Sequence, residues 1–212
     1  MTFLHQHRVG RRTAATLSAG AALLAIAAIA PVSANAALCT QNITGPHTGV
    51  LNVAANQKLC LKKAVQNGAV NVAPGGRLSV TGSTITGAVT LKAGYMEFRF
   101  CASKTVRGAI SATGGRTAVL IGGAGIGAVA CPANTIDGAV TLNANKASVT
   151  LAGNTIGGAV TASANLLGTT ISANRIGGAL TCTTNAPAPT NAGVRNAVFG
   201  GRSGQNCAVS TF

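Results

Sequence analysis

A Gly-Ala-aliphatic tripeptide recurs along most of the chain at nearly constant intervals. Two copies lie in NTIDGAVT, which begins at Asn134, and NTIGGAVT, which begins at Asn154. Successive copies are separated by 19, 19, 21, 19, 11, 20 and 20 residues, and their glycines are Gly49 (in the weaker GVLNVAAN), Gly68, Gly87, Gly108, Gly127, Gly138, Gly158 and Gly178. The one short step indicates a half-turn or an irregular coil. A fixed period of this length is typical of structural units that stack on one another.

The residues after each glycine keep its phase. Seven residues on, the chain has Asn56, Gly75, Gly94, Gly115, Asn134, Asn145, Asn165 and Asn185. Asn and Gly adopt a left-handed backbone most readily, so we expect one turn to recur in a single column. Two residues after each glycine stand Leu51, Val70, Val89, Ile110, Val129, Val140, Val160 and Leu180, and four residues after stand Val53, Val72, Leu91, Ala112, Cys131, Leu142, Ala162 and Cys182. This alternation predicts a strand with one side facing inward.

These patterns predict an all-β protein that forms a β-solenoid with coils of about 20 residues. The runs AVLI and SVTL, and the aliphatic residues just before several glycines, add further strands, so each coil holds two or three. One coil cannot bury its aliphatic side alone, whereas stacked coils bury it together. We also expect Asn145, Asn165 and Asn185 to hydrogen-bond along the stack. The period would suit leucine-rich repeats, but their Leu-x-x-Leu-x-Leu pattern is absent, and a β-sandwich has no reason to keep one phase.

The N-terminal segment has the three parts of a secretory signal peptide. MTFLHQHRVGRRTAATLSAG contains three arginines and no acid, and AALLAIAAIA and PVSANA follow it. We therefore expect residues 1–36 to be removed and the mature chain to be secreted, extracellular or associated with the cell envelope. The apolar run is shorter than the roughly 20 residues of a membrane-spanning helix, so we expect no membrane span after cleavage. Residues 37–185 are expected to form the solenoid, and residues 186–212 a capping tail.

All six cysteines lie in the expected mature chain. An even number of cysteines in an exported protein predicts three disulfides. The spacing suggests Cys39 with Cys60, one coil apart, and Cys182 with Cys207, which would tie the tail over the last coil. Cys101 and Cys131 remain to pair across the irregular segment, although six cysteines permit fifteen connectivities.

The quoted coils resemble those of the small secreted parallel β-helix proteins of actinobacteria. The resemblance rests on the Ala-rich leader, on NTIGGAVT and NRIGGALTCTTN, and on the tail from APAPTN to GQNC. It implies a right-handed parallel β-helix and export, and it implies no activity.

The expected mature chain is strongly basic. Removing Arg8, Arg11 and Arg12 leaves thirteen Lys and Arg residues against Glu97 and Asp137, a net charge of about +11. Such a field favours anionic partners, and we expect an anionic cell-envelope polymer or polysaccharide. The N-terminal half is the expected binding region, through Lys58, Lys62, Lys63, Arg77, Lys92, Arg99, Lys104, Arg107 and Arg116. The same charge would also serve solubility alone.

The residue inventory does not favour an enzyme. Polysaccharide hydrolysis requires paired carboxylates, but Glu97 and Asp137 are expected on different parts of the coil and about two coils apart. His47 is the one histidine of the mature chain, and no zinc-type cysteine spacing occurs. We predict no catalytic residues, no metal and no cofactor.

Two surface features were also weighed as binding sites. Tyr95, Phe98 and Phe100 could stack nucleic-acid bases beside Arg99, but internal packing is the favoured interpretation, and nucleic acid is not an expected partner. An ice-binding face would repeat Thr-x-Thr in every coil, whereas TIT at Thr84 becomes TID and TIG in later coils. Threonine is in any case favoured on strand surfaces.

We therefore expect a non-enzymatic exported structural or envelope-associated protein. The alternatives are a carbohydrate-binding or adhesion module that uses a flat solenoid face, and a divergent polysaccharide-active enzyme. End-to-end self-association of the rods is a further expectation if the ends are incompletely capped.

Overall fold

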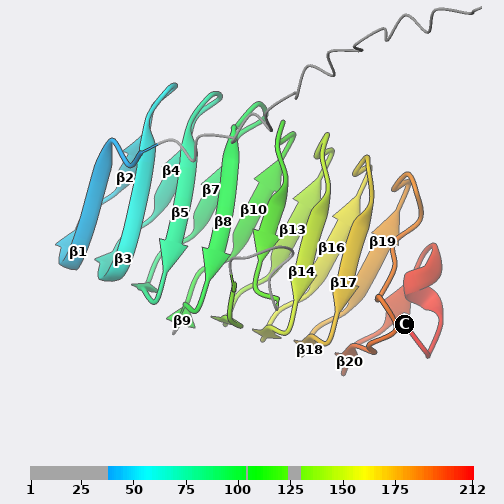
Figure 1. The fold of residues 1–212 in the computed structure, drawn as a ribbon. Helices are drawn as coiled ribbons and strands as arrows, with labels where there is room; N and C mark the ends of the chain where they lie inside the picture. Colours follow the sequence, from blue (N-terminus) through cyan, green and yellow to red (C-terminus); the bar gives the residue numbers. More distant parts are fainter. Residues whose placement is uncertain (1–37, 104, 124–129) are drawn as a thin grey trace, which may run out of the picture. The chain divides into compact units, whose positions relative to one another are not determined.

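The computed structural model describes residues 38–103, 105–123 and 130–212. The expected signal peptide, Lys104 and the Gly127 copy of the repeat lie outside these residues. The described chain is a β-solenoid of about eight coils in which strands of neighbouring coils pair in parallel. Figure 1 shows the near strands running down and the far strands running up as the chain advances, which makes the coil right-handed. The predicted fold class is therefore confirmed.

The strands form three faces, and the first, here called the β10 face, is an eight-stranded sheet. In axial order it contains β2 (Leu51–Val53), β4 (Val70–Val72), β7 (Val89–Leu91), β10 (Ile110–Thr113), β13 (Val140–Asn143), β16 (Val160–Ser163), β19 (Leu180–Thr183) and β21 (Arg202–Ser203). Its register is continuous, so residues at the same position of the repeat lie in one column from coil to coil.

The other two faces belong to one thirteen-stranded sheet that is folded along its length. Its first part, the β8 face, contains β1 (Gln41–Thr48), β3 (Lys58–Asn67), β5 (Arg77–Thr81), β8 (Glu97–Cys101), β11 (Val119–Ile121), β14 (Val149–Ala152) and β17 (Thr169–Ser172). Its second part, the β12 face, contains β6 (Thr84–Ile85), β9 (Thr105–Val106), β12 (Thr135–Ile136), β15 (Thr155–Ile156), β18 (Arg175–Ile176) and β20 (Ala197–Val198). β3 contributes to both parts because its backbone turns at Lys63, where φ is 51°.

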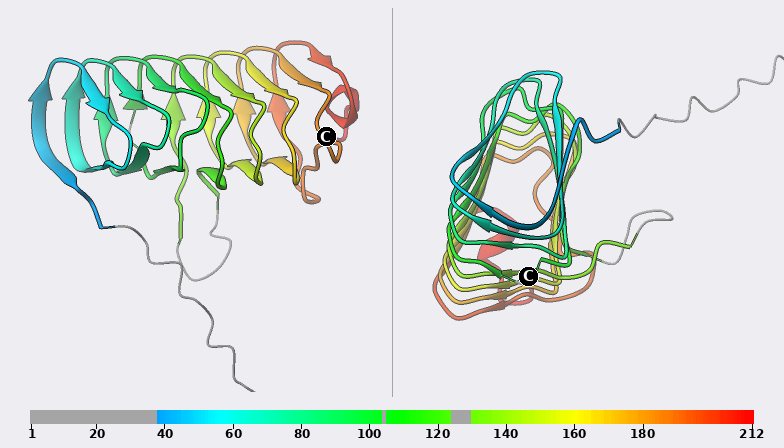
Figure 2. Two further views of the ribbon diagram at one scale, coloured as in Figure 1. Left: turned by 90° about the horizontal axis from the view of Figure 1, so that it is seen from above. Right: turned by 90° about the vertical axis from the view of Figure 1, so that its left-hand side faces the viewer.

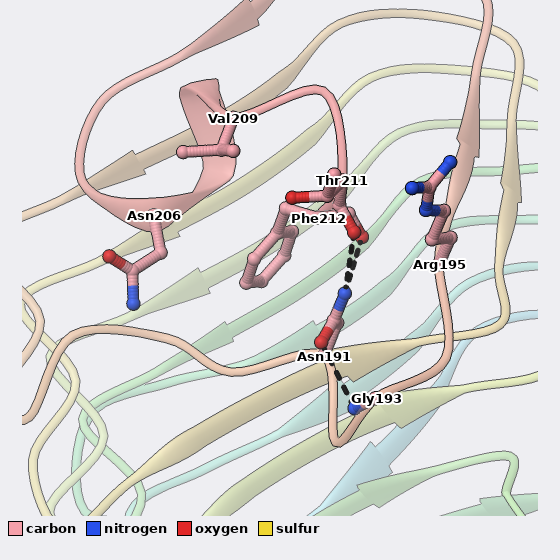
Figure 3. Close-up of a pocket in the computed structure, with 7 residues that line it drawn as sticks. All are labelled: Asn191, Gly193, Arg195, Asn206, Val209, Thr211 and Phe212. Atoms are coloured by element: carbon pink, nitrogen blue, oxygen red, sulfur yellow. Dashed lines mark hydrogen bonds between the residues drawn. The ribbon is translucent and has the colours of Figure 1, made fainter.

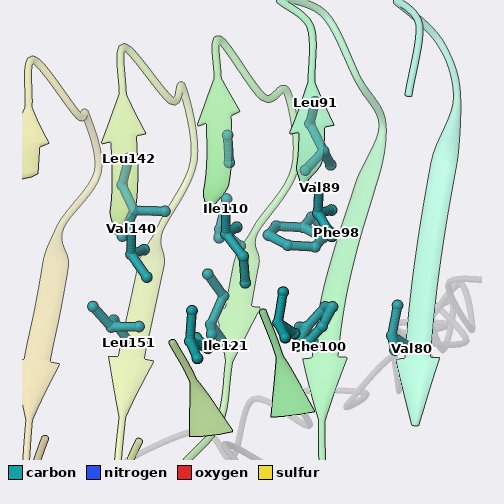
Figure 4. Packing of buried hydrophobic residues seen from close by; sticks show 14 of the residues in the cluster. Val80, Val89, Leu91, Phe98, Phe100, Ile110, Ile121, Val140, Leu142 and Leu151 are labelled. Atoms are coloured by element: carbon teal, nitrogen blue, oxygen red, sulfur yellow. The ribbon is translucent and has the colours of Figure 1, made fainter. Parts of the chain in front are cut away.

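The inward side chains of the three faces form one continuous core. Figure 4 shows Val89, Ile110 and Val140 on neighbouring strands of the β10 face, and Phe100, Ile121 and Leu151 on the β8 face opposite them. All six side chains are fully buried, with exposed fractions of 0 %. Each buried side chain of this size contributes about 1.5–3 kcal/mol through the hydrophobic effect, but only because coils on both sides cover it.

The corner between the β10 and β8 faces is filled by a ladder of buried amides. Its members are Asn145, Asn165, Asn185 and Gln205. Asn165 is typical: its Oδ1 accepts from the Asn145 backbone N–H at 3.1 Å, and its Nδ2 donates to the Leu142 carbonyl at 2.9 Å and to Asn185 Oδ1 at 2.9 Å. The predicted stacking of the asparagines is therefore confirmed. The ladder satisfies the backbone groups that the turn leaves unpaired inside the coil.

A second ladder, which the sequence analysis did not identify, lines the corner between the β8 and β12 faces. Its members are Asn134, Asn154, Asn174 and Asn196. The side-chain oxygens of Asn154, Asn174 and Asn196 each accept the backbone N–H of the preceding member at 3.0 Å. The Asn134 oxygen accepts the Ser103 N–H at 2.8 Å, and the Asn196 N–H donates to the Phe212 carbonyl at 3.0 Å. The expected single column of eight corner residues is therefore wrong for Asn134, which belongs to this second corner.

The left-handed residues of the first corner also differ from the prediction. Positive φ angles occur at Asn56, Gly75, Gly94, Gly114, Ala144, Ala164, Thr184 and Gly204. The prediction is right for the first three coils and wrong by one residue from Gly115 onward. The reason is the amide ladder: in the later coils the asparagine turns its side chain inward, and the residue before it takes the left-handed backbone.

The third corner, between the β12 and β10 faces, is a column of stacked glycines. It contains Gly49, Gly68, Gly87, Gly108, Gly138, Gly158, Gly178 and Gly200. A Cβ at Gly158 would lie 2.6 Å from the Ala139 backbone nitrogen, so the coils approach too closely there for any side chain. Gly138 stacks directly on Gly108, so this coil is 30 residues long, and Cys131 lies in its extra segment. The expected irregular coil is therefore this longer one.

The three disulfides join the predicted pairs. Cys39 and Cys60 lie with Cα atoms 5.8 Å apart, Cys101 and Cys131 4.7 Å apart, and Cys182 and Cys207 5.8 Å apart. The last one anchors the tail, whose short helix η1 (Asn206–Ala208) and buried Phe212 close the C-terminal end seen at the red end of Figure 2. The tail also adds β20 and β21 to the sheets.

The N-terminal edge carries polar groups in place of aliphatic ones. His47 and the fully buried Gln66 occupy the column that continues as Ile85, and His47 Nδ1 donates to Gln66 Oε1 at 2.7 Å. Pro46 in the edge strand β1 lacks an N–H group. A proline and inward polar residues both oppose the addition of another strand at a sheet edge.

The Asn ladder predicts a stability difference between two asparagines of neighbouring coils. Asn165→Ala is expected to lower the free energy of unfolding by about 2–4 kcal/mol, because it leaves several buried polar groups unpaired at about 1–3 kcal/mol each. Asn143 is the matched control, because its side chain lies outside the coil and accepts one hydrogen bond, from Ser163 Oγ. Asn143→Ala is expected to cost less than about 0.5 kcal/mol. Chemical denaturation followed by circular dichroism measures both, and equal losses would contradict the role of the ladder.

The glycine column predicts that one added methyl group disrupts stacking. Gly158→Ala is expected to cost about 2–3 kcal/mol through overpacking, or roughly 5–10 °C in melting temperature for a chain of this size. Gly201 is the control, since a Cβ there meets nothing within 4 Å and neither glycine has a positive φ. Differential scanning calorimetry should show Gly201→Ala melting with the parent protein. A Gly158→Ala variant that also does so would refute the close approach.

Candidate functional site

The structure distributes the nine basic residues proposed for binding around several sides of the solenoid. Lys62 and Lys63 lie exposed at the corner between the β8 and β12 faces, and Arg107 lies exposed at the corner with the glycine column. Arg99 lies on the β8 face, where its Nη2 donates to the Ala130 carbonyl at 3.2 Å. Lys104 is outside the described residues. The basic residues therefore do not form one continuous patch.

Lys58 is a structural residue. Its side chain is 9 % exposed, and its Nζ lies 2.8 Å from Glu97 Oε1. Lys58, Arg77 and Glu97 are register partners on three successive strands of the β8 face. Glu97 thus neutralises a buried lysine, and the Lys58 charge is not available to a ligand.

Three of the other predicted basic residues, Arg77, Lys92 and Arg116, lie near the corner between the β10 and β8 faces, and the structure adds Lys146. Arg77, Arg116 and Lys146 follow the turn between the β10 and β8 faces in their coils, where their backbone N–H groups donate to Gln57, Tyr95 and Gly115 of the coil before. Lys92 lies just before the same turn in the intervening coil, after β7. We call Arg77, Lys92, Arg116 and Lys146 the cationic edge.

The cationic edge presents one positive charge in each of four consecutive coils. Arg116 and Lys146 lie in one column, about 4.8 Å apart along the axis, whereas Arg77 begins β5 on the β8 face and Lys92 is in register with Thr113 at the end of the β10 face. Among the described residues, no carboxylate forms an ion pair with any of the four. Lys92, Arg116 and Lys146 are exposed and Arg77 is half-buried. The edge is therefore a group of cations that follows one corner through four coils, with three of its members exposed.

Lys146 is not among the residues predicted from the sequence, because the binding region was expected in the N-terminal half. A signal was nevertheless present. Lys146 stands eight residues after Gly138, as Arg116 stands eight residues after Gly108. Residues in the same phase of a solenoid repeat lie in one column, so this spacing placed the two cations together.

The two acids are too isolated for carboxylate chemistry. Glu97 begins β8 and is paired with Lys58, whereas Asp137 follows β12 and is exposed at another corner. They lie on neighbouring coils rather than two coils apart, but their different corners keep them from forming the acid–base pair of a glycosidase. Their separation agrees with the expectation from the sequence.

The aromatic residues of YMEFRF are part of the core. Tyr95, Phe98 and Phe100 are at most 1 % exposed, and the Tyr95 and Phe98 rings meet edge to face at 6.4 Å. The Tyr95 hydroxyl donates to Asn145 Oδ1 at 2.7 Å, at the start of the first amide ladder. Burial raises the pKa of Tyr95 far above its ordinary value, so the hydroxyl stays protonated. The predicted packing role is confirmed, and these rings cannot stack on a ligand.

A shallow cavity of about 430 Å³ lies beside the C-terminus. Figure 3 shows Asn191, Arg195 and Phe212 in its wall. Asn191 Nδ2 donates to the Thr211 and Phe212 carbonyls, and its Oδ1 accepts a hydrogen bond from the Gly193 N–H. Because these polar groups already hold the tail in place, the cavity is a consequence of capping.

No protein-family model matches the chain, and comparisons with curated proteins and with solved structures found no match. The chemistry of the exposed surface is therefore the basis for any functional proposal.

The Lys58–Glu97 pair predicts a difference between the two acidic residues. Glu97→Gln leaves the buried Lys58 without its counter-charge, and we expect a loss of about 1–3 kcal/mol, below the 3–5 kcal/mol of a fully buried pair because Glu97 is partly exposed. Asp137→Asn makes the same change in net charge at an exposed position and is expected to cost less than about 0.5 kcal/mol. Urea denaturation at neutral pH separates them, and a stable Glu97→Gln protein would show that Lys58 does not depend on the pair.

Proposed function

We propose that this is a non-enzymatic exported protein that binds an anionic polymer of the cell envelope along its cationic edge. The observation that carries the proposal is the row of Arg77, Lys92, Arg116 and Lys146, one cation per coil, with no acidic partner among the described residues. A net charge of about +11 on residues 37–212 adds a long-range field of the same sign.

The form of the edge supports a polymer as the ligand. Four charges along one corner of successive coils match a chain that carries several negative charges along its length. A small anion would gain from only one or two of them. Each exposed contact is worth little alone, but contacts made along one chain add through effective concentration.

Export is supported by two independent features. Three disulfides are typical of proteins that fold in an oxidising compartment. The first 36 residues have the composition of a secretory leader. Within the described ranges, the structure contains no helix of the length and apolarity that crossing a membrane requires. A structural role in the envelope follows from the same rigid, cross-linked rod.

Charge reversal at two corners tests the proposal. The Arg116→Glu/Lys146→Glu protein is expected to lose about tenfold or more of its affinity for dextran sulfate and for isolated anionic cell-wall polymer, because two of the four cations become anions. The Lys62→Glu/Lys63→Glu protein has the same net charge but keeps the edge, so it should lose much less. Isothermal titration across a salt series measures both, and binding should weaken as salt rises.

Uncharged dextran separates this function from the alternative of a neutral glycan-binding module. We expect no binding to dextran. Equal losses in the two double variants would show that a diffuse field, rather than the edge, holds the polymer. Salt-independent binding to dextran would overturn the proposal in favour of neutral glycan recognition.

A further inference from the structure

The outer side of the β10 face carries short uncharged side chains in straight columns. The central column contains Asn52, Asn71, Thr90, Ser111, Thr141, Thr161, Thr181 and Ser203. The column two residues further along the strands contains Thr113, Asn143, Ser163 and Thr183. The column on the other side contains Ala69, Ala88, Ala109, Ala139, Ala159 and Ala179.

This arrangement was hidden in the sequence because the hydroxyl residue varies between coils. The pattern appears as Ser111-x-Thr113, Thr141-x-Asn143, Thr161-x-Ser163 and Thr181-x-Thr183. The Thr-x-Thr of Thr84 and Thr86 lies on the β12 face, and the column that starts at Thr84 ends in Arg175 and Ala197. Thr-x-Thr is therefore lost along the β12 face, while the β10 face keeps a related pattern of mixed Thr, Ser and Asn.

The β10 columns form a regular two-dimensional array. Along the axis the repeat is the strand spacing of about 4.8 Å, and along each strand alternate residues lie about 6.6 Å apart. The register has no shift from β4 to β19, so the array is uninterrupted. It is also rigid, because the residues between the columns, such as Val140, Leu142 and Val160, are fully buried in the core.

The chemistry of the array excludes most ligands. Lys92, at its margin, is the one charged residue in these columns over β4 to β19, and no aromatic ring is present on which a sugar could stack. Short side chains also cannot reach around a flexible partner. What the array offers is a fixed grid of hydroxyl and methyl groups to a partner that is itself a lattice.

We propose that the β10 face binds ice. The axial spacing of the array is close to one repeat of crystalline water, whereas the backbone spacing along each strand is shorter than the other repeat, so the side chains have to splay slightly to match it. Half-buried threonines such as Thr141 and Thr161 hold their hydroxyl and methyl groups in fixed positions, because a β-branched side chain has few χ1 rotamers. Little side-chain entropy is then lost when ordered water anchors to the column. This inference does not rest on the proposed function, and Lys92 is the one residue that the array shares with the cationic edge.

Ice-affinity purification and a recrystallisation assay test the proposal with the secreted protein. The parent protein is expected to enter growing ice and to keep ice grains small. The Thr141→Tyr/Thr161→Tyr protein, which places two large rings in the centre of the array, should lose about tenfold or more in activity. The control is Thr135→Tyr/Thr155→Tyr, the same two changes in neighbouring coils of the β12 face, where both threonines are exposed. It should keep the parent's activity.

Each outcome decides the question. Exclusion of the parent protein from ice would overturn the proposal, whatever the variants do. Equal losses in the two double variants would also overturn it, because the β10 face would then have no special role. Circular dichroism identifies a misfolded variant, and Thr161→Lys then replaces it as a single change at the same column. Binding of the parent protein to crystalline chitin or cellulose without entry into ice would assign the face to a glycan instead.

Discussion

Parallel pairing of each coil with the next, in unbroken register, is the constraint on which the rest of this structure depends. A strand of about three residues is too short to be stable alone. Here each one pairs on both sides and covers the core of its neighbours. Because the coils must superimpose, every inward position becomes a column in which all side chains have to be compatible. The aliphatic columns, the amide ladders and the glycine column are three solutions to this one requirement.

The corners show how local chemistry meets that requirement. A turn leaves backbone N–H groups directed into the coil, and a buried donor without a partner is costly. In the C-terminal half, Asn165 and Asn174 each accept such a donor and pass a hydrogen bond to the next coil. In the N-terminal half, Tyr95 and Ser83 take the equivalent places. The two halves thus have different interiors but the same backbone path, which is why the glycine column runs the full length.

The sequence predicted the architecture because stacked coils require similar residues at equivalent positions, and this requirement makes the sequence periodic. The strands, the Cys39–Cys60 disulfide and the Asn145–Asn165–Asn185 ladder all follow from phase counting, whereas Cys101 and Cys131 were paired because they remained. Phase counting failed where phase was broken: the extra segment of the 30-residue coil shifted Asn134 into a false column. It was also blind to substitution within a column, so Lys146 and the mixed Thr, Ser and Asn column were missed. A column tolerates any outward residue of suitable size, and only the register of the strands shows which ones lie together.

The difference between inward and outward positions also limits where function can reside. Inward positions are fixed by neighbours on both sides, so a solenoid can vary only its outward residues and its corners. Each outward position is repeated once per coil, and any binding surface is therefore a row along the axis rather than a pocket. The cationic edge and the hydroxyl columns both run along the axis, and they meet at Lys92. A protein with such surfaces is suited to partners that are themselves periodic, and a polymer and a crystal are the two kinds of periodic partner that its charged and uncharged rows match.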